Sequence, residues 1–95
     1  MAETTKGRRR ITFTARAPGA GSVIVAGDFN GWDEEKHAMA QRPDGLWQKV
    51  LMLAPGRYEY KFKVDDQWMC DSGNPIRCEN VYGSRNSVIV VSPVE

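Results

Sequence analysis

Residues 56–68 have the sequence GRYEYKFKVDDQW, which contains the clearest strand pattern in the chain. Apolar and charged side chains alternate along residues 58–64, as in a β-strand with one buried and one exposed face. Asp65 and Asp66 interrupt this run and favour a turn, and strand-like residues resume around Trp68. The segment therefore predicts a β-hairpin with an aromatic inner face, which the other strands support.

Four further segments have strand-like composition, namely residues 11–16, 22–26, 46–53 and 87–92. Turn signals rich in Gly, Pro, Asn and Asp separate them at intervals of roughly 8 to 12 residues. Residues 33–39 are polar and allow one helical turn, whereas residues 71–85 lack periodicity and predict a long loop. The pattern predicts an all-β protein, an immunoglobulin-like antiparallel β-sandwich of about seven strands.

Length and charge restrict the class of protein. Ninety-five residues suit one domain with a modest core, and we expect a flexible tail at residues 1–9 and a folded domain at residues 10–95. The 13 basic and 12 acidic residues nearly cancel, which argues against a nucleic-acid partner despite Arg8, Arg9 and Arg10. No apolar run approaches the roughly 20 residues that span a bilayer. We therefore expect no membrane partner and, without a signal-peptide pattern, a cytoplasmic location.

The reactive side chains do not predict a catalytic or metal site. Cys70 and Cys78 are too few for a disulfide-rich scaffold, and both free thiols and a local bridge stay open. Together with His37, the only histidine, they supply too few ligands for zinc. His37 lacks an evident nucleophile and is expected in a loop. The adjacent carboxylates at residues 34–35 and 65–66 fit solvated turns better than a glycosidase acid pair. We predict no metal, no cofactor and no enzyme activity.

Tryptophans beside turns suggest a ligand surface. Trp32 follows an Asn-Gly turn and Trp68 follows the hairpin turn, while Lys61 lies on the outer face of the hairpin. A pyranose has an apolar C–H face that can lie on an indole ring, and its hydroxyls need hydrogen-bonding groups at the rim. Lys61 supplies donors, and the late loop adds Asn80, Tyr82 and Asn86. Packing remains the alternative for any of the tryptophans, and it is the favoured interpretation for Trp47.

Four segments resemble carbohydrate-binding module family 48 in their sequence and order. They are VAGDFNGW at residues 25–32, PGRYEYKFKVDDQW at 55–68, NP at 74–75 and NVYGSRNSVIVV at 80–91. This family includes the glycogen-binding domain of the AMP-activated protein kinase β subunit and the N-terminal domains of isoamylases and branching enzymes. The resemblance covers roughly residues 10–91. It implies an early-set immunoglobulin-like sandwich that binds an α-1,4-glucan such as glycogen, starch, a maltooligosaccharide or a cyclodextrin.

The resemblance also implies which residues contact the sugar. The two sugar-stacking tryptophans of the glycogen-binding domain match Trp32 and Trp68, and its sugar-contacting lysine matches Lys61. Its late-loop asparagine matches Asn86. A working glucan site is therefore expected, because copies of the module that have lost binding usually lack this tryptophan pair.

Two loops depart from the pattern of the family. Tyr82 falls where the kinase domain has an aliphatic side chain that reaches into the glucan helix, whereas Ser84 in the same loop matches the loop hydroxyl of that domain. Asp66 replaces the usual glycine of the hairpin turn, so we expect a different turn shape.

The function predicted from the sequence is non-catalytic binding of glycogen- or starch-type glucan. A second interpretation is a regulatory protein-interaction module that docks on a kinase or a glycogen-metabolising, amylolytic enzyme without binding sugar.

Overall fold

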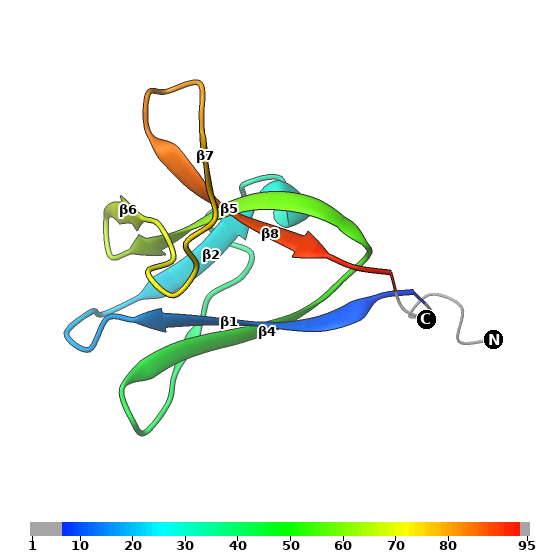
Figure 1. Ribbon diagram of the computed structural model, residues 1–95. Coiled ribbons are helices and arrows are strands. Elements are labelled where there is room, and N and C mark those ends of the chain that lie inside the picture. The colour runs from blue at the N-terminus through cyan, green and yellow to red at the C-terminus, as the bar shows by residue number, and fades with distance from the viewer. Residues whose placement is uncertain (1–6, 94–95) are drawn as a thin grey trace.

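The computed structural model describes residues 7–93 as two antiparallel β-sheets packed against each other (Figure 1). The smaller sheet has the order β1–β4–β3, with strands β1 (Arg9–Arg16), β4 (Leu46–Leu53) and β3 (Ala40–Gln41). The larger sheet has the order β2–β5–β8–β7, and β6 also pairs with β5. Its strands are β2 (Val23–Gly27), β5 (Gly56–Val64), β6 (Gln67–Met69), β7 (Arg77–Glu79) and β8 (Arg85–Val91). The predicted all-β, immunoglobulin-like sandwich is confirmed, with eight strands in the described residues.

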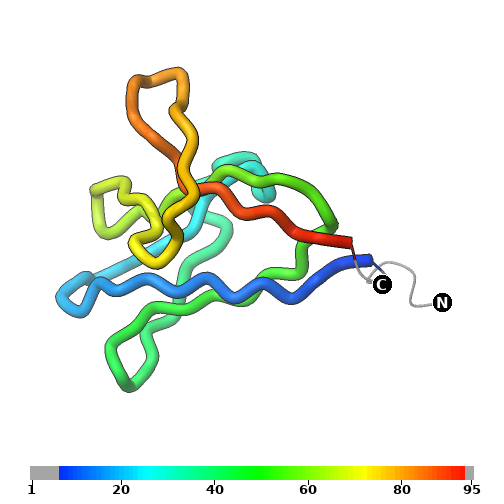
Figure 2. The backbone as a smooth tube through the Cα atoms, viewed as in Figure 1, coloured from blue at the N-terminus to red at the C-terminus, as the bar shows by residue number. Residues whose placement is uncertain are grey.

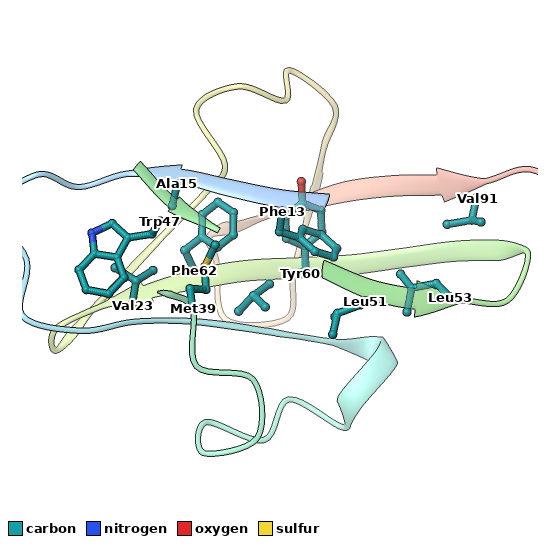
Figure 3. Close-up of a cluster of buried hydrophobic side chains, with 11 residues drawn as sticks. Phe13, Ala15, Val23, Met39, Trp47, Leu51, Leu53, Tyr60, Phe62 and Val91 are labelled. Carbon is teal, nitrogen blue, oxygen red and sulfur yellow. The ribbon is translucent and has the colours of Figure 1, made fainter. Parts of the chain in front are cut away.

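The core lies between the sheets, and β5 contributes its aromatic centre (Figure 3). Tyr60 and Phe62 are 2% and 3% exposed, and the Tyr60 ring meets Phe13 of β1 edge-to-face at 5.0 Å between centroids. Trp47 of β4 is also buried, and its indole N–H donates to the carbonyl of Ala17 at 2.9 Å. The inward orientation of alternate residues in β5 and the packing role of Trp47 are therefore both confirmed.

The predicted hairpin is formed by β5 and β6, which join through a two-residue turn at Asp65 and Asp66. Asp65 has φ 53°, a left-handed conformation that aspartate tolerates better than most residues. Its Oδ1 accepts hydrogen bonds from the backbone N–H groups of Gly21 and Ser22 at 3.0 and 3.1 Å. The turn is therefore fixed to the loop between β1 and β2 through an aspartate side chain.

Residues 71–76 are connected to the core through the hydroxyl of Tyr60. This hydroxyl donates to Asp71 Oδ2 at 2.7 Å and accepts from Asn74 Nδ2 at 3.0 Å. Burial raises the pKa of the Tyr60 hydroxyl, so it keeps its proton and acts as a donor at neutral pH. Asn74 also donates to the carbonyl of Val88 at 2.8 Å. These hydrogen bonds fix the position of the Asn74-Pro75 segment just before β7.

The prediction of one long loop over residues 71–85 is wrong in part, because β7 lies within it. Its residues pair with the start of β8, and Cys78 lies opposite Asn86. Only three residues take part, and this length is too short to show alternation. Strand β8 accordingly begins at Arg85, two residues before the predicted start. The loop between β7 and β8 projects away from both sheets (Figure 2).

Three other local predictions concern the segment after Trp32, the two cysteines and the N-terminal tail. Residues 34–36 form a turn but no helix within the segment 33–39 that allows a helical turn, and His37 lies outside the strands as predicted. Cys70 and Cys78 are free thiols. Strand β1 begins at Arg9, whereas most of the predicted tail, residues 1–6, lies outside the described residues.

Residues 7–93 show neither a membrane-spanning helix nor a cluster of metal ligands. Within that range, no helix has the length and apolar character needed to cross a bilayer. The same residues contain no group of three or more His, Cys, Asp or Glu side chains placed to hold a metal ion.

We predict that Gly27→Ala destabilises the domain, because Gly27 ends β2 directly against β5. A Cβ atom there would lie 2.5 Å from the carbonyl oxygen of Glu59 and 2.7 Å from Cβ of Tyr60. The expected loss is about 1–3 kcal/mol in the free energy of unfolding, measured by urea denaturation. Gly19→Ala is the matched control, because nothing lies within 4 Å of its Cβ position. Equal stability of the two variants would contradict this packing argument.

Candidate functional site

A groove of about 1080 Å³ lies on the outer face of the larger sheet. It is bounded by the turn after β2, by β5 and β6, and by the loop between β7 and β8. Its lining includes all six predicted site residues, namely Trp32, Lys61, Trp68, Tyr82, Ser84 and Asn86. The fold thus brings together side chains from four segments that are up to 54 positions apart in the sequence, from 32 to 86.

Trp32 and Trp68 form the aromatic part of the groove. Their ring centroids are 6.4 Å apart and their planes are inclined by 61°. The Trp68 side chain is 39% exposed and Trp32 is half-buried. Neither indole belongs to the core, and the two together give the groove an inclined pair of apolar surfaces.

Asn30 sets the position of Trp32. Its Oδ1 accepts from the backbone N–H groups of Gly27 and Trp32 at 3.0 and 3.1 Å. Gly31 and Trp32 then have φ values of 66° and 60°, which turn the chain sharply outward. The Asn-Gly turn predicted from the sequence is confirmed, and the amide side chain of Asn30 is the reason for its shape.

The same amide determines the protonation of His37. Both backbone partners of Asn30 Oδ1 are donors, so the other amide atom, Nδ2, must be the group that faces His37 Nδ1 at 2.8 Å. His37 Nδ1 is therefore an unprotonated acceptor. Burial, followed by the charges of Lys49 and Lys36, lowers the pKa of His37 from its usual 6.5.

Asp28 holds the indole of Trp32 through a hydrogen bond. The indole N–H donates to Asp28 Oδ1 at 3.1 Å. The second oxygen, Oδ2, accepts from the backbone N–H of Glu59 in β5 at 2.8 Å. Asp28 begins the 3-10 turn η1 (Asp28–Asn30), so one carboxylate connects this turn, the Trp32 ring and the central strand.

A chain of polar contacts crosses the other end of the groove. Lys61 Nζ donates to the hydroxyl of Ser84 at 3.1 Å, and Asn80 Nδ2 donates to the same hydroxyl at 2.9 Å. Asn80 Nδ2 also donates to Asn86 Oδ1 at 3.0 Å, and Asn86 donates to Glu59 Oε1 at 3.0 Å. Asn86 is therefore a floor residue, 7% exposed, with its oxygen and one N–H already engaged.

Glu59 is held ionised by its neighbours. The hydrogen bond from Asn86 and then that from Arg57, whose Nη1 lies 2.9 Å from Glu59 Oε2, lower the pKa of this carboxyl. An ionised Glu59 can only accept hydrogen bonds, which matches the two donors that it faces.

The loop between β7 and β8 ends in two almost fully exposed apolar residues. Val81 and Tyr82 are 91% and 90% exposed. Asn80 Oδ1 organises the loop by accepting from the backbone N–H groups of Tyr82 and Ser84 at 2.9 and 3.2 Å. The Tyr82 side chain thus lies at the rim of the groove, on a backbone that Asn80 fixes.

Five further residues of the groove are not predicted from the sequence, namely Asp28, Glu34, Glu59, Glu79 and Val81, whereas Asn80 belongs to the predicted ligand surface but not to the residues matched to the family. A usable signal existed for Glu59, because it lies two positions from Lys61 on the exposed face of a strand that alternates strictly. Asp28 and Glu34 flank the Trp32 turn at short range. Their contact with the groove depends on the fold of that turn, which alternation alone does not give.

We predict that acidification loosens the Trp32 turn through His37. A lowered pKa in the folded state favours the neutral imidazole, so its stabilising contribution is complete above the unfolded pKa of about 6.5 and disappears as the pH falls through the folded value. NMR titration should give a pKa for His37 below 6.5. Between about pH 7 and about pH 5.5, the wild type should lose more unfolding free energy than His37→Gln, which cannot titrate. A larger loss in the variant would refute this assignment.

Comparison with known protein families finds a match over most of the chain. Residues 10–95 match the model of a family described as the glycogen recognition site of AMP-activated protein kinase.

Individual relatives cover most of this chain. The 1,4-alpha-glucan branching enzyme GlgB of Thermosynechococcus vestitus is 38% identical over 74 residues, which are 76% of this chain and 10% of the enzyme. Protein PTST homolog 2, chloroplastic, of Arabidopsis thaliana is 36% identical over 73 residues, 77% of this chain and 13% of that protein. The branching enzyme GlgB 2 of Xanthomonas campestris pv. campestris is 32% identical over 84 residues, 86% of this chain and 12% of the enzyme. The chain thus spans about a tenth of the length of these relatives.

Proposed function

Because the chain belongs to the family of the glycogen recognition site of AMP-activated protein kinase, a family of carbohydrate-binding modules, we propose that it binds α-1,4-linked glucan of the glycogen or starch type. In this proposal, Trp32 and Trp68 stack against successive sugar rings. The module has no catalytic role of its own.

The observation that carries the proposal is the inclined tryptophan pair at one end of an open groove with a polar far end. An α-1,4-linked glucan coils, so neighbouring pyranose rings turn relative to each other. Two indoles inclined by 61° suit such a curved ligand better than a flat one. Lys61 and Ser84 offer hydrogen-bonding groups to the hydroxyls at the rim, and Tyr82 adds a ring beyond them.

The names of the relatives support the choice of ligand. Two of them are 1,4-alpha-glucan branching enzymes, so the substrate in their names contains the linkage proposed here.

The carboxylates of the groove support a binding role without hydrolysis. A glycosidase needs one carboxyl group that is protonated and one that is free to attack or to activate water. Three of the four carboxylates that line the groove, all except Glu79, have polar side-chain partners within residues 7–93. Asp28 accepts from the Trp32 indole and a backbone N–H, and Glu34 pairs with Lys63. The pKa of Glu59 is lowered, which is the wrong direction for a general acid.

The affinity for a short ligand should be modest. Each aromatic contact contributes about 0.5–1.5 kcal/mol beyond the buried area, which places short sugars at roughly micromolar to millimolar Kd. A polymer offers many sites, so retention on glycogen should exceed the affinity for a single oligosaccharide. Docking on a kinase or a glycogen-metabolising enzyme stays a prediction without support from the groove.

We predict that Trp68→Ala and Trp32→Ala each weaken binding of β-cyclodextrin about tenfold or more, a loss of roughly 1.4 kcal/mol. Titration calorimetry gives the Kd, and gel electrophoresis in the presence of glycogen tests the polymer. Met69→Ala is the matched control, because Met69 follows Trp68 in β6 and contributes to a small cavity with Ala15 and Phe62 on the other face. Wild-type affinity in both tryptophan variants, with the fold intact by circular dichroism, would refute the proposal.

A further inference from the structure

We propose that Lys63, held by Glu34, is a positioning residue that fixes the Trp68 ring and thereby sets the affinity of the groove for its ligand. This inference rests on the proposed function, because it concerns the same site. It adds two residues that do not need to touch the sugar.

The register of the hairpin places Lys63 beside Trp68. The two residues are direct cross-strand partners in β5 and β6, so their side chains lie on the same face of the sheet. Lys63 Nζ lies over the Trp68 ring, 5.7 Å from its centroid. This arrangement is a cation–π contact, and Trp68 remains 39% exposed.

Trp68 depends on this contact more than Trp32 depends on any single one. Trp32 is held through its backbone by Asn30 and through its indole N–H by Asp28. Trp68 lies in a strand of three residues that pairs only with β5, and all three residues are exposed. Within residues 7–93, its ring has two specific contacts, one edge-to-face with the Trp32 ring and one with the ammonium group of Lys63.

Glu34 restrains the lysine. Lysine has a flexible four-carbon stem, so its ammonium group has no fixed position without a partner. Glu34 Oε1 lies 2.5 Å from Lys63 Nζ. This hydrogen bond also raises the pKa of Lys63, which therefore stays charged at neutral pH.

The ion pair joins the two halves of the aromatic surface. Glu34 lies two residues after Trp32, whereas Lys63 lies opposite Trp68. The contact therefore links the turn that carries one indole to the hairpin that carries the other. Half of the Glu34 side chain is exposed, and exposed ion pairs contribute little to global stability. The effect of the pair should appear in binding and not in unfolding.

We predict that Lys63→Met weakens β-cyclodextrin binding about two- to fivefold, as expected for loss of an exposed cation–π contact. Lys63→Arg should restore binding, because arginine keeps the cation above the ring. Glu34→Gln should weaken binding and remove part of its sensitivity to salt. Glu35→Gln is the matched control, because Glu35 is adjacent in the chain but does not line the groove. Wild-type or tighter binding by Lys63→Met would overturn the inference.

A double-mutant cycle separates positioning from direct contact. In the Trp68→Ala background, Lys63→Met should have no further effect on retention by glycogen, because the ring that it positions is absent. An equal, additive loss in that background would mean that Lys63 binds the sugar itself and would overturn the positioning role.

The same variants distinguish this inference from the proposed function. If Trp68→Ala and Trp32→Ala bind like the wild type, the proposed function fails and the inference fails with it. If Trp68→Ala loses binding but Lys63→Met does not, only the inference fails. A measurement without ligand gives an independent test, because the Nε1–H NMR signal of Trp68 should shift in Lys63→Met and Glu34→Gln but not in Glu35→Gln. An unchanged signal in the first two would overturn the inference.

Discussion

The alternation of side chains along β5 is the constraint on which the rest of the structure depends. Tyr60 and Phe62 enter the core, while Glu59, Lys61 and Lys63 face the groove side of the same strand. A slip of one residue against β2, β6 or β8 would exchange the two sets. Burial of the aromatic face therefore fixes the register, and the register places the polar side chains of the site.

Much of the fold follows from local pattern. The alternation in β5 and β1 predicts these strands. The Asn-Gly pair before Trp32 and the Asp65-Asp66 pair likewise predict the turns that form. Strand β7 is not predictable in this way, because three residues are too few to show a period and the segment before β7 is held by hydrogen bonds of Asp71 and Asn74 to the distant Tyr60. Hydrogen bonds between residues that are distant in the sequence cannot be predicted from the local pattern of side chains.

The candidate site shows the same division. The tryptophans, Lys61 and the loop residues were identified from spacing and family resemblance, and the fold collects them in one groove. The acidic residues around them were not, because their role depends on distances between segments, such as Asp28 to the backbone of Glu59. These carboxylates act as acceptors that hold indoles, amides and cations in place. A cluster of acids beside the candidate site is thus compatible with a rigid platform and does not require hydrolysis.

The short edge strand β7 limits the pairing of sheets between neighbouring copies of this chain. It forms one edge of the larger sheet, and it is three residues long with Arg77 and Glu79 at its ends. So short and charged an edge gives another chain little backbone with which to pair. Neighbouring copies of the chain at high local concentration can therefore hardly extend the larger sheet across this edge.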